Sequence, residues 1–167
     1  MESPTVSEGI ITIRILFIIL PILMGTIHCI WRRDVPSFSK VECFFVYFLV
    51  IGVGLQRLLV GHLEIYHKDL VAAYIGWPSS LFLSEVGKAN IAFGILGILS
   101  FWFNGGWREA TALGNGLFLL MVGIGHLRYN ISHLYFYKEI PALLIATDFI
   151  IAGVLFTLLI LRRFSKA

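Results

Sequence analysis

Long apolar runs separated by short polar segments dominate the chain. Each run has about 20 residues, which is the length that an α-helix needs to cross the hydrocarbon core of a bilayer. We therefore predict five transmembrane helices, over residues 10–31, 41–62, 80–103, 110–127 and 141–161. No long linker or low-complexity segment divides the chain, so residues 1–167 are predicted to form one all-α transmembrane domain, an integral membrane helical bundle.

The stretch between the second and third predicted spans is polar and aromatic. Its apolar residues, from Leu63 to Tyr74, recur at helical spacing until Gly76, Trp77 and Pro78 break the pattern. This pattern predicts a short helix that lies in the membrane interface.

Composition agrees with a membrane protein and argues against an ordinary soluble domain. Charged residues make up 14% of the chain and hydrophobic residues 58%, whereas soluble domains have about 25% charged residues. The net charge is +3, but the basic residues lie mostly at the ends of spans and form no stripe with interleaved aromatics. We therefore predict no nucleic-acid partner.

The basic residues also predict the orientation. With the N-terminus outside, the cytoplasmic segments contain Arg32, Arg33, Lys40, Arg108, Arg162, Arg163 and Lys166, and the outer loops contain Lys68, Arg128 and Lys138. Cytoplasmic loops are enriched in lysine and arginine, so we predict an outer N-terminus and a cytoplasmic C-terminus.

Several ionisable groups lie inside the predicted spans, where each costs several kcal/mol unless it is paired or faces water. These groups, together with the amides and the histidine beside them, are Arg14, Arg57, Glu85, Lys88, Asp148, Gln56, Asn90, Asn115 and His126. Counting about 1.5 Å per residue from each helix end places the charged groups in the outer leaflet.

Helical spacing predicts which of these residues share a face. Asn115 and His126 lie on one face of the fourth span, and Arg57 lies on a glycine-lined face of the second. Glu85 and Lys88 are one turn apart and are expected to pair. Pairs of glycines seven residues apart predict close helix packing, either within the bundle or between two copies; these are Gly54 and Gly61, Gly87 and Gly94, and Gly116 and Gly123.

Three interpretations of the polar residues stay open. The first is an outward-facing pocket that binds or transports a small polar or amphipathic ligand, lined by Arg57, Glu85, Lys88, Asn90, Asn115, His126 and Asp148. The second is a membrane-embedded enzyme that acts on a lipid or quinone, with Glu85 or Asp148 as proton donor or acceptor and His126 as a second acid/base group. The third is a structural subunit in which Arg57 pairs with Asp148 or Glu85 and only holds the bundle together.

The sequence assigns no cofactor. His62 and His126 are considered as axial haem ligands, but there is no second histidine pair and no attachment motif. The Glu-x-x-His pattern of di-iron bundles occurs once, at Glu64 and His67, whereas such sites need two. No metal site is predicted. The expected partners are the lipid bilayer, a small-molecule or lipid ligand, and a second copy of the chain.

One block of the sequence resembles a family signature. It consists of Gly76-Trp77-Pro78-Ser79-Ser80, Phe82, Glu85-Val86-Gly87, Ala89-Asn90, Gly94 and Gly97. It is similar to the GWPxSPFQxEVGxAN signature of an uncharacterised prokaryotic family of small polytopic membrane proteins, a domain of unknown function. A second stretch, Gly125-His126-Leu127, resembles the GHI element of the same family. The resemblance implies a prokaryotic cytoplasmic membrane and a shared pattern that includes Trp77, Pro78, Glu85, Asn90 and His126. Leu81 and Leu83 depart from the proline and glutamine of the signature.

Overall fold

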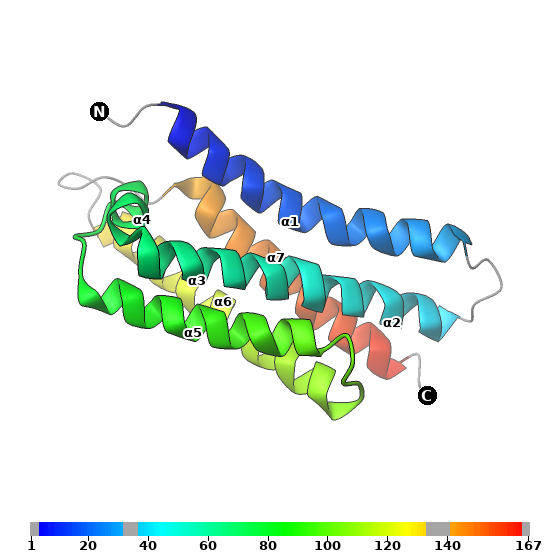
Figure 1. Ribbon diagram of the computed structural model, residues 1–167. Coiled ribbons are helices and arrows are strands. Elements are labelled where there is room, and N and C mark those ends of the chain that lie inside the picture. The colour runs from blue at the N-terminus through cyan, green and yellow to red at the C-terminus, as the bar shows by residue number, and fades with distance from the viewer. Residues whose placement is uncertain (1–3, 32–36, 133–140, 165–167) are drawn as a thin grey trace.

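The chain folds into long helices that lie side by side as a bundle (Figure 1). The computed structural model describes residues 4–31, 37–132 and 141–164, and no strand occurs within these ranges. The elements are α1 (Pro4–Trp31), α2 (Ser37–Tyr47), η1 (Phe48–Leu55), α3 (Gln56–Tyr66), α4 (Lys68–Ile75), α5 (Leu81–Leu99), α6 (Gly106–Ser132) and α7 (Ala142–Phe164).

Five of the helices in the described part of the chain are long and apolar enough to cross a membrane. They cover Thr12–Trp31, Lys40–Tyr66, Leu81–Leu99, Gly106–Ser132 and Ala142–Phe164. The predicted five-helix membrane bundle is therefore confirmed, and these spans indicate an integral membrane protein. The orientation stays a prediction, and four of the basic residues on which it rests lie outside the described residues: Arg32, Arg33, Lys138 and Lys166.

Four of the five spans end at other residues than predicted, and one of these, the fifth span, continues to Phe164 instead of ending at residue 161. The second and fourth spans continue to Tyr66 and Ser132, because polar residues that ended the apolar runs remain helical. The third helix ends at Leu99, where the Ser100 hydroxyl and backbone N–H both donate to the Leu96 carbonyl. The following turn passes through Gly105, whose φ of +61° favours glycine.

The second span contains a π-helical segment, η1, that the sequence did not predict. Here the chain lies very close to α5: a Cβ atom added to Gly54 would lie 2.9 Å from the backbone nitrogen of Ile98, so only glycine fits. Gly52 of the same segment lies against Pro21 of α1, and α1 continues through that proline. π-Helical segments are rare and often occur at functional sites. This one lies directly before Arg57.

The paired glycines pack inside the bundle. A Cβ on Gly61 would lie 2.6 Å from the Gly87 carbonyl oxygen, so α3 and α5 approach each other through their backbones. Gly116 and Gly123 lie against phenylalanine rings of α7. Close packing within one chain therefore accounts for these glycines.

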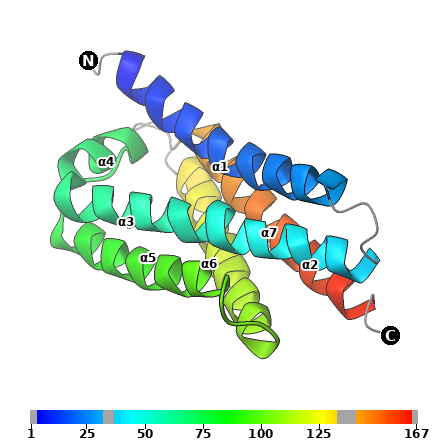
Figure 2. The same cartoon turned by 45° about the vertical axis from the view of Figure 1, so that its right-hand side comes forward.

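The short helix between the second and third spans is present as α4, and it folds over one end of the bundle (Figure 2). It ends at Gly76, which has the left-handed φ of 75°. Tyr74 and Ile75 pack with Leu83 of α5 and Leu144 of α7. Its position in a membrane interface stays a prediction.

Candidate functional site

Polar side chains gather at two opposite ends of the bundle. Asp148 lies near the start of α7 and Arg162 near its end, about 21 Å apart at 1.5 Å per residue. The Asp148 cluster consists of Arg14, Arg57, Glu64, Asn90, His126, Thr147 and Asp148. The Glu42 cluster consists of Glu42, Arg108, Glu109, Arg162 and Arg163.

Asp148 is a buried carboxylate, 4% exposed, that connects three helices. Its Oδ1 lies 3.5 Å from Arg14 Nη1 of α1, and its Oδ2 lies 3.2 Å from His126 Nδ1 of α6. Arg14 Nη1 also donates to Thr147 Oγ1 at 3.2 Å. When His126 Nδ1 carries the ring proton, it donates to Asp148, and Nε2 of the neutral ring is left as an acceptor.

Arg57 is equally buried, and it connects α3 to α5. Its Nη1 donates to Asn90 Oδ1, and Asn90 Nδ2 donates to Glu64 Oε2 at 2.6 Å. The guanidinium lies over two aromatic rings, 4.5 Å from the centre of Phe118 and 5.4 Å from that of Phe93. Such contacts stabilise a cation more strongly where water is excluded.

The two halves of the Asp148 cluster are close enough for their charges to act on one another. Arg57 interacts with the charges of Asp148, Glu64 and Arg14. Burial raises the pKa of Tyr74, on α4, and the charge of Arg14 acts in the opposite direction, so this phenol is also close to the cluster. Two arginines therefore face two carboxylates, which balances their charge.

Several buried polar atoms near the cluster have no hydrogen-bond partner among the described residues. They are Arg57 Nε, Arg57 Nη2, Tyr74 Oη, Trp77 Nε1 and Asn115 Oδ1. Trp77 contacts His126 edge to face, with ring centres 6.0 Å apart. An unsatisfied buried polar atom costs about 1–3 kcal/mol, so each one needs an explanation. Most of these atoms are donors, which favours an acceptor as the missing partner.

The structure brings together four of the seven residues predicted to line the pocket: Arg57, Asn90, His126 and Asp148. Asn115 is buried on α6, where its Nδ2 donates to the Thr111 carbonyl.

Glu85 and Lys88 lie elsewhere, on the outer surface of α5. They pair with each other at 2.6 Å, as their spacing predicts, and their side chains are 64% and 62% exposed. Glu85 is five residues from Asn90, which is about 140° around an α-helix, so the two face different directions. The expected pairing of Arg57 with Asp148 or Glu85 is not found. Asn90 takes the Arg57 hydrogen bond, and Asp148 binds Arg14 and His126.

Sequence reasoning missed Glu64 as a site residue because the predicted second span ends at residue 62. The spacing of Arg57, Gly61 and Glu64 along one helix face was the signal that it belongs to the site. Thr147 and Tyr74 gave no signal of their own, since a threonine and a tyrosine are ordinary in such segments.

The Glu42 cluster was also missed, because charges at the ends of spans are ordinary. Arg162 is only 3% exposed, and it donates through Nε to Glu42 and through Nη1 to Glu109 at 2.7 Å. Arg108 Nη1 donates to the other oxygen of Glu42 at 2.6 Å. These bonds join α2, α6 and α7, and the acidic and basic side chains satisfy one another.

The two histidines considered for haem have different surroundings. His126 binds Asp148, whereas His62 is exposed on α3, with its ring 4.8 Å from that of Tyr66 and 6.1 Å from that of His67. These contacts give haem no support, and no cofactor is assigned. Within the described ranges, no three His, Cys, Asp or Glu side chains are grouped to hold a metal ion.

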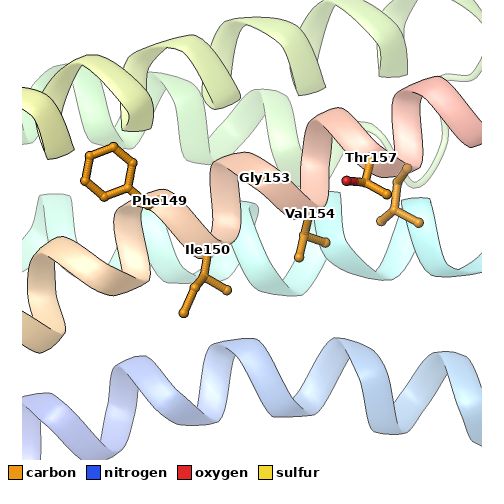
Figure 3. A pocket seen from close by; sticks show the side chains of 6 residues that line it. Phe149, Ile150, Gly153, Val154 and Thr157 are labelled. Carbon is orange, nitrogen blue, oxygen red and sulfur yellow. The ribbon is translucent and has the colours of Figure 1, made fainter.

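An open, apolar groove of about 370 Å³ runs along the surface of α7 (Figure 3). It is lined by Phe149, Ile150, Gly153, Val154, Thr157 and Leu158. Figure 3 shows Ile150 and Val154 pointing toward α1. They follow Thr147 at i+3 and i+7 and so share its helix face. Part of the groove therefore continues along α7 from Thr147 of the Asp148 cluster.

Comparison with known proteins assigns the chain to a family. No curated protein and no solved structure matches it significantly. The model of a family of unknown function (DUF6790) matches residues 11–167. The match covers nearly the whole chain and all five candidate spans, as the resemblance to an uncharacterised family predicts. The chain therefore belongs to this family of unknown function, DUF6790.

Proposed function

We propose that the protein binds a small amphipathic ligand at the Asp148 cluster, as a membrane binding protein or as part of a transporter. The observation that carries this proposal is Arg57, a guanidinium that is 4% exposed and has both Nε and Nη2 without a partner in the described chain. Nε and Nη2 form one edge of the planar guanidinium fork, which is suited to a phosphate, carboxylate or carbonyl group.

A network with a purely structural role would not explain why Nε and Nη2 of Arg57 have no partner in the described chain. Two arginines and two carboxylates already balance one another, and a network that only stabilises the bundle would be expected to satisfy its buried donors. A bound acceptor group would recover about 1–3 kcal/mol for each satisfied nitrogen.

The groove on α7 supports an apolar part of the ligand. It lies along α7 beyond Thr147 in the sequence and is lined almost entirely by hydrocarbon, so it suits an acyl or isoprenoid chain. A ligand with a polar head at the cluster and an apolar tail along α7 would use both features.

The test is to purify the protein in mild detergent and identify retained small molecules by native mass spectrometry and solvent extraction. The wild type is expected to retain a ligand, and Arg57→Leu to lose it. Arg57→Lys keeps the charge but removes the planar fork, so it is expected to weaken retention as well. Arg163→Leu, at the exposed end of α7, is the matched control and is expected to retain the ligand.

Retention that is equal in the wild type and both Arg57 variants would contradict the proposal, as would a wild type that carries no molecule. In either case the cluster would be structural only.

A second candidate function is acid/base catalysis on a lipid or quinone. The supporting observation is the 3.2 Å contact between Asp148 Oδ2 and His126 Nδ1, an arrangement in which a carboxylate orients a histidine for proton transfer through Nε2. Incubation of the purified protein with a total lipid extract tests this candidate. New product masses that disappear in His126→Gln would support catalysis, and unchanged masses would leave binding as the function.

A further inference from the structure

One face of α5 carries exposed charges in the middle of an apolar stripe. The exposed residues of this stripe are Leu81, Glu85, Lys88, Ala92 and Ile95. Their spacing alternates between four and three residues, which is the heptad pattern of a helix that packs against another helix. We call these five residues the α5 stripe.

The length of α5 leads us to place the charges of the α5 stripe within the hydrocarbon layer. The 19 residues of α5 span about 28 Å, so the helix needs its whole length to cross a layer of about 30 Å. Glu85 and Lys88 are then about 6 and 10 Å below its first residue. Ionised side chains at such a depth are costly when they face lipid, even when they pair with each other.

No described element of the same chain covers this face. α5 uses its glycine face to pack against α3 and η1, where Gly87, Gly94 and Gly97 are buried. The helix lies at the edge of the bundle in both views (Figures 1 and 2). The α5 stripe therefore points away from the bundle.

We propose that a second copy of this chain covers the α5 stripe and forms a two-fold symmetric dimer. In such a dimer each side contributes the same surface, so the surface must be complementary to itself. The Glu85–Lys88 pair meets this condition, because a carboxylate and an ammonium one turn apart can interact with the same two groups of the other copy.

Around the two-fold axis the four charges would alternate in sign, and each would lie between two opposite charges. Ala92, one turn further along, is small enough to let the two helices approach. The dimer removes the charged pair from lipid, and it is independent of any ligand at the Asp148 cluster.

Charge reversal tests the proposal. Glu85→Lys gives a chain with two positive side chains in the stripe, and Lys88→Glu gives one with two negative side chains. Each variant alone is expected to lose the dimer, because four like charges would meet. Co-expression of the two variants with different affinity tags is expected to give a heterodimer that co-purifies, since opposite charges then meet between the chains.

Neither variant keeps the pair within its own helix, so rescue by mixing reports the contact between chains. Dimers formed by each single variant to the same extent as by the wild type would overturn the proposal, as would failure of the mixture to form heterodimers.

Cysteine cross-linking in native membranes keeps the charges intact and covers the case in which the charge variants do not fold. In a background with Cys29→Ser and Cys43→Ser, Ala92→Cys is expected to form a disulfide-linked dimer under oxidation. Met121→Cys, on the exposed face of α6, is the control and is expected to remain monomeric. The opposite pattern, or no cross-link at residue 92, would overturn the proposal.

Discussion

Asp148 shows how a charged residue becomes tolerable inside a membrane bundle. Its two oxygens face Arg14 and His126, so the carboxylate is compensated from two sides. Arg57 is compensated less completely: one nitrogen is bonded to Asn90, two aromatic rings lie against the guanidinium, and two nitrogens are unpartnered. We therefore expect Asp148 to contribute mainly to stability, and we propose that Arg57 binds the ligand.

Replacement of Asp148 by leucine is expected to destabilise the protein strongly. The substitution leaves Arg14 without its carboxylate and the His126 ring without its Asp148 partner, and breaking a buried charge pair typically costs about 3–5 kcal/mol. Reversible unfolding in mixed micelles measures this free energy. Thr157→Val, on an exposed position of the same helix, is the control and is expected to change it by less than about 0.5 kcal/mol. A loss for Asp148→Leu as small as that of the control would show that Asp148 does not hold the three helices together.

At the scale of elements, α3 and α5 are joined by backbone contact. Gly61 of α3 and Gly87 and Gly94 of α5 lie between the two helices, and Gly54 of the preceding η1 packs against the same helix α5. The Arg57–Asn90–Glu64 chain of hydrogen bonds crosses the interface between α3 and α5. The close approach brings Asn90 within reach of both Arg57 and Glu64. This glycine-lined interface between α3 and α5, which we call the seam, therefore positions Arg57, Asn90 and Glu64 of the candidate site.

Gly61→Ala is expected to force α3 and α5 apart. Its new Cβ would lie 2.6 Å from the Gly87 carbonyl oxygen and 3.0 Å from the Ile91 nitrogen, and overpacking of this kind typically costs about 1–3 kcal/mol. The free energy of unfolding in micelles is again the measurement. Gly153→Ala is the matched control, because nothing lies within 4 Å of its Cβ position and alanine favours the helix. Equal stability of the two variants would contradict the claim that α3 and α5 need glycine at residue 61 to pack together.

The membrane spans were predictable from sequence, whereas the partners of their polar residues were not. Hydropathy identifies a span because each run of apolar residues has to match the thickness of a bilayer. The π-helical turns of η1, which lie where this segment packs against α5, have no such signature. Helical spacing placed Asn115 and His126 on one face of the fourth span, but it gave no direction for that face or for Glu85. Only the packing of α5 shows that Glu85 faces outward and Asn90 inward.

At the scale of the whole molecule, the two polar clusters differ in kind. In the Glu42 cluster, three arginines and two glutamates join α2, α6 and α7, and the guanidinium of Arg108 also donates to the carbonyls of Ser100 and Phe101. The Asp148 cluster has unpartnered donors beside a groove. The Glu42 cluster therefore holds three helices together at one end of the bundle, and we propose the Asp148 cluster at the other end as the ligand site.

Arg162→Leu is expected to destabilise the end of the bundle that contains the Glu42 cluster. Arg162 is almost fully buried between Glu42 and Glu109, so its loss is expected to cost about 3 kcal/mol or more. The neighbouring Arg163 is 77% exposed and 3.8 Å from Glu109, so Arg163→Leu is expected to cost less than about 1 kcal/mol. Thermal unfolding in detergent compares the two. A larger loss for Arg163→Leu would contradict the assignment of Arg162 as the centre of this cluster.

The orientation of the molecule is predicted from basic residues at the ends of the spans, three of which, Arg108, Arg162 and Arg163, belong to the Glu42 cluster. A fluorescent-protein fusion at the C-terminus is expected to fluoresce, because that terminus is predicted to be cytoplasmic. An alkaline phosphatase fusion at the same position is expected to be inactive. The reverse result would place the Asp148 cluster on the cytoplasmic side.

The central claim is that Arg57 holds a ligand through Nε and Nη2. A cryo-electron microscopy map of the purified protein in lipid nanodiscs tests it most directly. We predict density that belongs to no protein atom, within hydrogen-bond distance of both nitrogens and continuous with a chain along the α7 groove. A map in which protein side chains satisfy both nitrogens and the groove is closed would contradict the claim.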